Sequence, residues 1–453
     1  MKNVQSPKSS KRSTRRNSSF AAVALVSVIA LAASGRAGAD EDSGQNGNAV
    51  LEWNQVFIDT LVATNTANAV SQRLGAIVHT AIFDAYNGIE QRYTPVFVHD
   101  EAPAGASKKA AVIAAAYTAL VDLFPSQKEA LDARYAASLA ALSDDDDDDG
   151  GRSRQRGIDW GIAVAERVLN WRVGDGFNGA YPPFNGGTAV GQWRPTPPAF
   201  GPMSAQSLAF TAPFVVISNT QFQPPPPRGL LDATYTSDFN AVKALGRDAG
   251  SMRTAEQTAL ALFWDGNTSV HWNDAGNQIA RANHLSVSDS NRLFAVLNIA
   301  MADTALTVWS AKRFYGSLPT AVTWRPITAI TLADTDGNPD TVADPSWLPL
   351  ITTPSHPEYP AGHPSMNGSA STVILSYFGP EQTFTLTTPG QPARTYTSIL
   401  QARSDADNAR VWGGMHYPST VAVSDGVGQA VAHYVNRNSM QPLHGSGSGH
   451  DRD

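Results

Sequence analysis

Basic, imidazole and glycine residues recur in three short stretches of the second half of the chain, "KRFY…WRPITAI", "HPEYPAGH" and "ARVWGGMHYP". They are Lys312, Arg325, His356, Gly362, His363, Arg410 and His416. Arginines grip a tetrahedral oxyanion with forked hydrogen bonds. Gly362 and Pro364 mark a helix start, and a helix N-terminus offers unpaired N–H groups and a positive dipole end to an anion. The set therefore predicts a site for a phosphate-like anion.

The residues alone leave other interpretations open. His363 and His416 are also typical of core histidines with satisfied ring nitrogens. A zinc site built from His356, His363 and His416 is a minor alternative, because no carboxylate ligand spacing supports it. Asp265, in "FWDGNTSVHWN", is suited either to orient an arginine of the site or to cap a helix. Trp309, three residues before Lys312, belongs either to the core or to the pocket wall.

The order Lys…Arg-Pro, then Pro-x-Gly-His, then Arg-x5-His resembles the vanadium-dependent haloperoxidase and type 2 phosphatidic acid phosphatase (PAP2) superfamily. The three stretches are most similar to its bacterial haloperoxidase branch. The similarity extends to "FWDG…HWN" and, more weakly, to "RLGAIVHTAIFDAYNGIEQRYTP". It covers most of the chain outside a Pro-rich middle. The resemblance implies an all-α fold of two helical bundles, with a vanadate cofactor in the C-terminal one.

The same resemblance implies which groups hold the oxyanion. Lys312, Arg325 and Arg410 would bind the equatorial oxygens of vanadate, and the N–H of Gly362 would donate to another oxygen. Fixed cations would offset the charge on these oxygens.

By resemblance, His416 would be the axial ligand to the metal, and His363 would be the general acid/base. Trp309 and His356 would line the halide side, and a histidine near the latter position favours bromide or iodide over chloride. Vanadate is a Lewis acid that polarises peroxide for attack by a halide. The expected reactants are hydrogen peroxide and a halide, with a small organic acceptor as a further partner.

One departure from the family concerns spacing. The family separates its Lys from the Arg-Pro by six residues, whereas twelve lie between Lys312 and Arg325. Seven steps along a helix return nearly to the same face, but thirteen do not. Because Gly316 and Pro319 lie in this interval, we infer a six-residue loop insertion that restores convergence, with Arg313 as the fallback cation.

Two further departures concern single positions. Ala361 stands where the family has Ser before Gly-His, which removes a hydroxyl donor to the oxyanion, worth about 1.5–3 kcal/mol. The phosphatase branch has an Asp four residues after its nucleophilic His, whereas this chain has Thr420 there. The leading hypothesis is therefore a haloperoxidase. The alternatives are an acid phosphatase that forms a phosphohistidine at His416, and a non-catalytic oxyanion-binding protein.

Composition and charge argue against several classes of ligand and partner. The chain of 453 residues has no cysteine, which excludes disulfides and thiolate metal ligands. Its net charge of −7 disfavours binding to nucleic acid or to anionic membranes. The sequence does not fix the oligomeric state, and a homodimer stays open.

Residues 1–39 read as a signal peptide. A basic segment precedes the apolar run "FAAVALVSVIALAASG", and "AGA" ending at Ala39 is a small-residue cleavage site. We expect a secreted or periplasmic protein without a membrane anchor after cleavage, exported by the general or the twin-arginine route. Removal of the segment would change the net charge from −7 to −14.

Apolar spacings of three and four predict helices over most of the remaining chain. We expect an N-terminal helical bundle with a Pro-rich wrap in residues 40–240, a C-terminal bundle with the anion site in residues 241–440, and a disordered tail in residues 441–453. Trp193, Phe200 and Phe210 favour an ordered wrap over a linker for residues 174–227. A hairpin is predicted around Pro389 and Gly390, and the run of aspartates at 144–149 is predicted to be a solvated loop.

Overall fold

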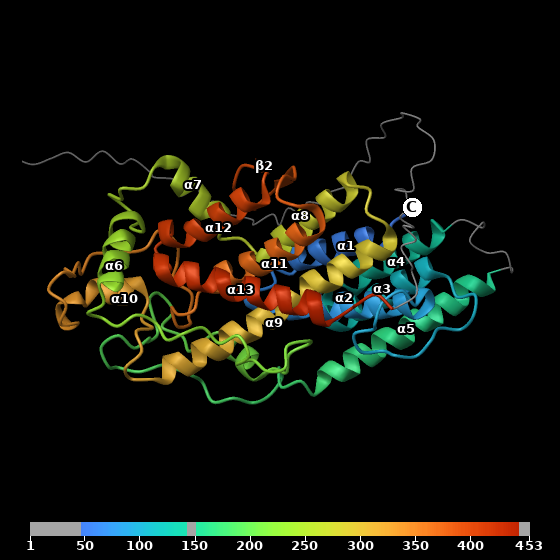
Figure 1. Cartoon of the computed structure of the whole chain (residues 1–453), viewed down its shortest axis with the longest axis horizontal. Coiled ribbons are helices and arrows are strands. Elements are labelled where there is room, and N and C mark those ends of the chain that lie inside the picture. The colour runs from blue at the N-terminus through green and yellow to red at the C-terminus, as the bar shows by residue number, and fades with distance from the viewer. Residues whose placement is uncertain (1–46, 143–150, 444–453) are drawn as a thin grey trace, which may run out of the picture. The chain divides into compact units, whose positions relative to one another are not determined.

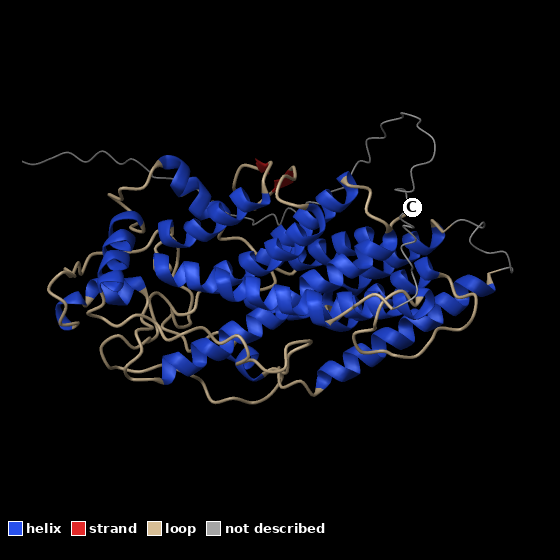
Figure 2. Cartoon of the chain, in the orientation of Figure 1, coloured by secondary structure: helices blue, strands red, loops and turns tan. Residues whose placement is uncertain are grey.

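The structure is a computed structural model that describes residues 47–142 and 151–443. The predicted signal peptide, the run of aspartates and residues 444–453 lie outside the described residues. The described residues form one compact unit. Figure 2 shows that the regular secondary structure of the described part is helical apart from one short pair of strands, with long loops between some of the helices. The predicted all-α class is confirmed.

The elements follow the predicted helical stretches closely. In chain order they are α1 (Ala49–Ala63), α2 (Asn68–Glu90), α3 (Lys108–Leu123), η1 (Pro125–Gln127), α4 (Lys128–Ala140), α5 (Arg152–Val173), η3 (Gln206–Phe210), α6 (Ala233–Leu245), α7 (Ala255–Phe263), α8 (Thr268–Ala282), α9 (Val287–Ser317), α10 (Pro326–Thr331), η4 (Ala333–Thr335), α11 (Gly362–Phe378), β1 (Phe384–Leu386), β2 (Arg394–Tyr396), α12 (Ile399–Trp412) and α13 (Pro418–Asn438). The antiparallel strands β1 and β2 pair Phe384 with Tyr396, which confirms the predicted hairpin.

The long helix α9 is the centre of the fold. It packs against α2, α11 and α13, which lie around it in Figure 1. Among the described residues it is the one single helix long and apolar enough to cross a membrane, but 94% of its apolar window is buried inside the protein. Its apolar character therefore serves the core, which continues from α1 and α2 through α9 to α11 and α13.

The Pro-rich segment is an ordered wrap, but its aromatic residues behave differently from one another. Trp193 is fully buried, whereas Phe200 is 64% exposed and Phe210 is 45% exposed. Asp303, in α9, accepts hydrogen bonds from three consecutive backbone N–H groups of the wrap, at residues 214–216. The wrap is thereby attached to the central helix by hydrogen bonds to the Asp303 side chain as well as by apolar burial.

Two of the predicted domain limits can be compared with the structure. The limit at residue 240 falls inside α6, and α2 from the first half packs directly on α9 from the second. Residues 441–443, which we expected in the tail, pair with the chain around Tyr93. The division into two bundles stays a prediction.

The residues between Lys312 and Arg325 form the last turn of α9 and a short loop. Helix α9 continues to Ser317, so Gly316 lies inside the helix and the loop begins at Leu318. The N–H groups of residues 323 and 324 donate to the carbonyl of residue 191 in the wrap. These bonds hold the returning loop in place immediately before Arg325, which precedes α10.

Candidate oxyanion site

A cavity of ≈ 270 Å³ lies where α2, α9, α11 and α12 approach one another. It is lined by Asn68, Ala69, Gln72, Ser204, Asp265, Trp309, Thr352, Pro354, His356, Gly362, His363, Met366, Arg410 and His416. Six of the eight predicted site residues therefore share one cavity. Lys312 and Arg325 do not line the cavity. Arg325 contacts the rings of His356 and His416, which do line it.

Helix ends position the residues that line the cavity. Gly362 and His363 begin α11, whose first-turn N–H groups have no carbonyl partner within the helix. Arg410 is in the last turn of α12, and His416 is in the turn between α12 and α13. Pro418 begins α13, a position where its missing N–H costs no helical hydrogen bond. The Gly and Pro residues of the motifs thus set where these helices begin.

Arg325 joins two of the site histidines. Its Nη1 lies 3.2 Å from His416 Nε2, and its Nη2 lies 2.7 Å from His356 Nδ1. Its Nη1 also donates to the backbone carbonyl of Met415. Because a guanidinium only donates, both of these ring nitrogens face it as acceptors.

Lys312 reaches the same region despite the longer interval. Its Nζ donates to the carbonyls of Pro357 (2.6 Å) and Glu358 (3.2 Å). Burial, reinforced by the Arg325 cation, lowers the pKa of Lys312 well below its usual value, while Glu358 opposes this shift. Arg313, the fallback cation, instead lies over the ring of Phe184 at 4.1 Å and outside the cavity.

Arg410 has a buried donor without a hydrogen-bond partner. Its Nη1 donates to Asp265 Oδ1 at 2.8 Å, which answers the question of what Asp265 does. Its Nε is buried and has no hydrogen-bond partner. An unpaired buried N–H costs about 1–3 kcal/mol. This donor, on a side chain that lines the cavity, fits an anion bound there.

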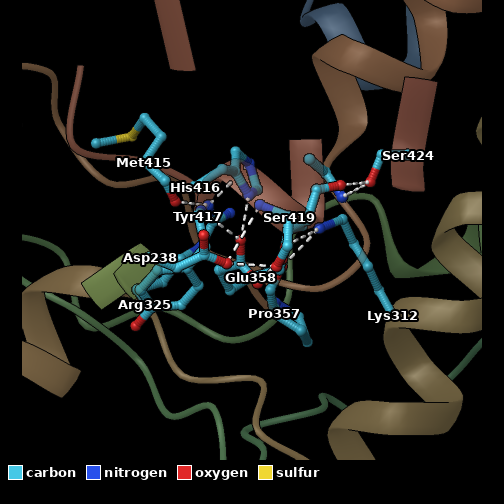
Figure 3. A network of polar contacts seen from close by, with 12 residues as sticks. Asp238, Lys312, Arg325, Pro357, Glu358, Met415, His416, Tyr417, Ser419 and Ser424 are labelled. Atoms are coloured by element: carbon cyan, nitrogen blue, oxygen red, sulfur yellow. Dashed lines mark hydrogen bonds and ion pairs between the residues drawn. The ribbon is translucent and has the colours of Figure 1, made fainter. Parts of the chain in front are cut away.

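His416 is held from behind by a carboxylate, as Figure 3 shows. Its Nδ1 lies 2.9 Å from Glu358 Oε1, so Nδ1–H donates and Nε2 keeps its lone pair. Burial, followed by the Arg325 and Lys312 cations, lowers the pKa of His416 well below its usual value. A neutral imidazole with an unprotonated Nε2 is the form required of a ligand or a nucleophile, although this Nε2 accepts a hydrogen bond from Arg325 Nη1.

Glu358 is the functional residue that sequence reasoning missed. It stands inside "HPEYPAGH" and is fully buried. Burial raises its pKa to about 7, while Arg325 and Lys312 oppose the shift. Thr420, at the position of the phosphatase Asp, donates to its other oxygen at 3.2 Å. The signal available was an acidic residue within a motif otherwise made of site residues.

The remaining predicted residues occupy the cavity wall. Trp309 Nε1 donates to the Ser204 carbonyl at 3.1 Å, and its ring lies 5.4 Å from the His356 ring. Burial, followed by Lys312 and Arg325, lowers the pKa of His356 well below its usual value. Ala361 is fully buried and caps α11 without a side-chain hydrogen bond.

Among the residues that the structure describes, no group of three or more His, Asp or Glu side chains is arranged to hold a metal ion. His356 faces Arg325, and His416 faces Glu358 on one side and Arg325 on the other. The three-histidine zinc alternative therefore gains no support from this geometry.

Comparison with known proteins bears on the fold and on the C-terminal part of the chain. Residues 292–445 match the family model of the VCPO second helical-bundle domain. The fold is similar to a bacterial vanadium-dependent iodoperoxidase, at 22% identity and a TM-score of 0.74, over 90% of this chain and 100% of that one. It is also similar to the holo and apo forms of a bacterial vanadium-dependent chloroperoxidase, at 19% and 18% identity and TM-scores of 0.63 and 0.62. These matches cover 82% of this chain and 92% and 94% of those. No curated protein matches by sequence.

The fold is that of the vanadium haloperoxidases. Residues 292–445, which match the VCPO second helical-bundle domain, contain all eight predicted site residues. The resemblance to the vanadium haloperoxidase/PAP2 superfamily is thereby confirmed.

Proposed function

We propose that this protein is a vanadate-dependent haloperoxidase that oxidises a halide with hydrogen peroxide. The observation that carries the proposal is the unpaired Nε–H of Arg410, a residue that lines one cavity together with His416, whose Nε2 is unprotonated. A donor and a ligand atom facing one small cavity suit an oxyanion that contains a metal. Bound vanadate would supply a Lewis acid that activates peroxide toward a halide.

The side chains of the site would each have a role in this proposal. The oxyanion would be held by Arg410, by the first turn of α11 at Gly362 and by the buried Arg325. Lys312, which does not line the cavity, would add positive charge. His416 would be the ligand through Nε2. His363 would move protons, since burial, followed by the Arg410 charge, lowers its pKa well below its usual value and leaves it neutral.

Bromide or iodide is the proposed halide, in preference to chloride. Trp309 and His356 form one wall of the cavity and would accept a large, weakly hydrated halide. A small organic molecule is a further proposed acceptor. The comparison proteins include an iodoperoxidase and a chloroperoxidase, so the preference of this chain is a matter for measurement.

The contact between Glu358 and His416 favours a second candidate, an acid phosphatase. A nucleophilic histidine needs a carboxylate on its other nitrogen, and Glu358 provides one although Thr420 replaces the expected Asp. His416 Nε2 would attack phosphorus, and His363 would protonate the leaving oxygen. A protein that binds an oxyanion without turnover is the third alternative.

We also propose export, on the basis of the signal peptide predicted in residues 1–39. Amino-terminal sequencing of the protein recovered from the medium or periplasm would check this, with Asp40 expected as the first residue.

One assay separates the three functions. Purified protein is freed of metal, reloaded with vanadate, and mixed with peroxide and bromide or iodide in the presence of a halogen-accepting dye. Vanadate-dependent halogenation that phosphate suppresses supports the proposal. Phosphate release from a chromogenic ester without halogenation supports the phosphatase. Oxyanion binding without either reaction supports the third.

A further inference from the structure

The first turn of α2 reaches the site from the other half of the chain. Asn68 and Gln72 line the cavity, although both lie more than 200 residues before the matched family segment. Asn68 Nδ2 lies 3.2 Å from His363 Nε2. Within the part of the chain that the structure describes, Asn68 is the one residue of the first half whose side chain makes a hydrogen bond to a predicted site side chain, since the other such contact, from Trp309, is to the backbone carbonyl of Ser204.

The orientation of the Asn68 amide follows from a backbone donor. The N–H of Thr268 can only donate, and it lies 3.0 Å from Asn68 Oδ1. The Thr268 hydroxyl and Gln72 Nε2 donate to the same oxygen, at 2.8 Å and 3.0 Å. The oxygen of the amide is therefore fixed toward Thr268, and its NH2 group is the one that faces His363.

The orientation of Asn68 determines the tautomer of His363. An amide NH2 only donates, so His363 Nε2 must accept and carries no proton. The other ring nitrogen then carries the proton, which agrees with the hydrogen bond between the His363 ring and the Gly266 backbone. A donor opposite Nε2 also disfavours the doubly protonated ring, since an imidazolium would present N–H to N–H.

We propose that Asn68 is a positioning residue of this site, which holds His363 as a neutral imidazole protonated on Nδ1 and keeps its Nε2 unprotonated beside the cavity that both residues line. This inference deepens the proposed function, because it assigns the starting protonation of the group that would move protons.

The Asn68→Asp variant tests the proposal most cleanly. Asp has the same shape, and its Oδ1 can still accept from Thr268 and Gln72. Its other oxygen replaces a donor with an acceptor opposite Nε2, so His363 should gain a proton there. Asn68→Leu removes both functions. Asn438→Ala, an exposed position at the end of α13 outside the cavity, is the matched control.

The first readout does not depend on catalysis. Metal-free protein with ¹⁵N-labelled histidine is examined by NMR, and the His363 signals are assigned by their loss in His363→Gln. We expect the Nδ1–H tautomer in the wild type and in Asn438→Ala, a ring protonated on Nε2 in Asn68→Asp, and a mixture in Asn68→Leu. An Nε2–H tautomer in the wild type, or identical signals in all variants, would overturn the proposal.

Kinetics of the vanadate-loaded protein form the second readout. Loss of a correctly protonated acid/base costs about 10²–10⁴-fold in rate. Asn68→Asp should lower kcat by at least about 100-fold, while the KM for bromide stays within about twofold. Unchanged kcat in Asn68→Asp counts against the proposal. A wild type that shows the Nδ1–H tautomer but no halogenation refutes the proposed function and leaves the role of Asn68 standing.

Discussion

Glu358 Oε1 lies 2.9 Å from His416 Nδ1, and the exposed fractions of the two side chains are 1% and 2%. The carboxylate comes from the loop before α11, and the histidine comes from the turn after α12. Lys312 and Arg325 act on the same carboxylate electrostatically. Glu358 therefore both selects the tautomer of His416 and offsets buried positive charge that an empty anion site would leave unbalanced.

Replacement of Glu358 separates these two effects. Glu358→Gln keeps an oxygen that can accept from His416 Nδ1–H but removes the charge, whereas Glu358→Leu removes both. Removing one partner of a buried ion pair costs about 3–5 kcal/mol. We expect a loss of this size in the free energy of unfolding for Glu358→Leu, and a smaller loss for Glu358→Gln, measured by guanidinium titration. Glu256→Gln, at an exposed ion pair, is the control. Equal stability of all three variants would contradict the role of Glu358.

Ala361→Ser restores the hydroxyl that the family has before Gly-His. Ala361 is the N-cap of α11 and makes no side-chain capping bond, so a serine should stabilise the protein by about 0.5–2 kcal/mol. The hydroxyl proton can also donate to the oxyanion, and a charged hydrogen bond of about 1.5–3 kcal/mol corresponds to roughly 10- to 150-fold tighter binding. Calorimetric titration of metal-free protein with vanadate measures this. Weaker vanadate binding by Ala361→Ser would show that this side chain does not face the anion.

Arg410→Lys tests the unpaired donor directly. Lysine keeps the charge but cannot place a donor at the Nε position while also reaching Asp265. We expect vanadate and phosphate affinity to fall roughly 10-fold or more, in line with the loss of one charged hydrogen bond. Arg403→Lys is the control, because Arg403 lies on the same helix and pairs with Asp425 away from the cavity. The idea fails if both variants bind the anions equally well.

The attachment of the wrap predicts a pH dependence of stability. Burial raises the pKa of Asp303 to about 6, although three backbone N–H groups oppose the shift. The folded protein then binds this proton more tightly than the unfolded chain does. Its contribution to stability is complete below the ordinary pKa of 3.8 and is lost as the pH rises to about 6. The difference in unfolding free energy between wild type and Asp303→Asn should therefore shrink from about pH 4 to pH 6 and stay level above it.

Guanidinium titrations across this pH range measure the difference. Asp334→Asn, at an exposed aspartate, is the control and should show a constant difference from wild type. A gap between wild type and Asp303→Asn that widens with rising pH would contradict the sign of the effect.

Much of the site could be predicted because its residues sit at sequence-marked helix starts and turns. Pro and Gly beside His363 and His416 determine where α11 and α13 begin, and these breaks are visible in one sequence. The inserted residues between Lys312 and Arg325 left Lys312 in place, since the loop returns through backbone bonds to the wrap.

The rest depends on contacts between distant segments. Glu358 meets His416 across 58 residues, and Asn68 meets His363 across 295, so neither pairing leaves a local pattern. A carboxylate partner for His416 was expected four residues after it, where the chain has Thr420. Thr420 instead donates a hydrogen bond to Glu358, which is the carboxylate that contacts His416. The exposure of Phe200 and Phe210 could not be predicted for the same reason. Aromatic composition indicates that the wrap is ordered, but it does not indicate which of its side chains pack against the rest of the protein.

The most direct test of the account is vanadate reconstitution of wild type and His416→Ala, with bound vanadium and the halogenation rate measured on the same samples. The account predicts about one vanadium per chain and peroxide-dependent bromide or iodide oxidation in the wild type, and loss of both in His416→Ala, because the proposed ligand atom is Nε2 of this cavity-lining histidine. Equal vanadium content and equal rates in the two proteins would contradict it.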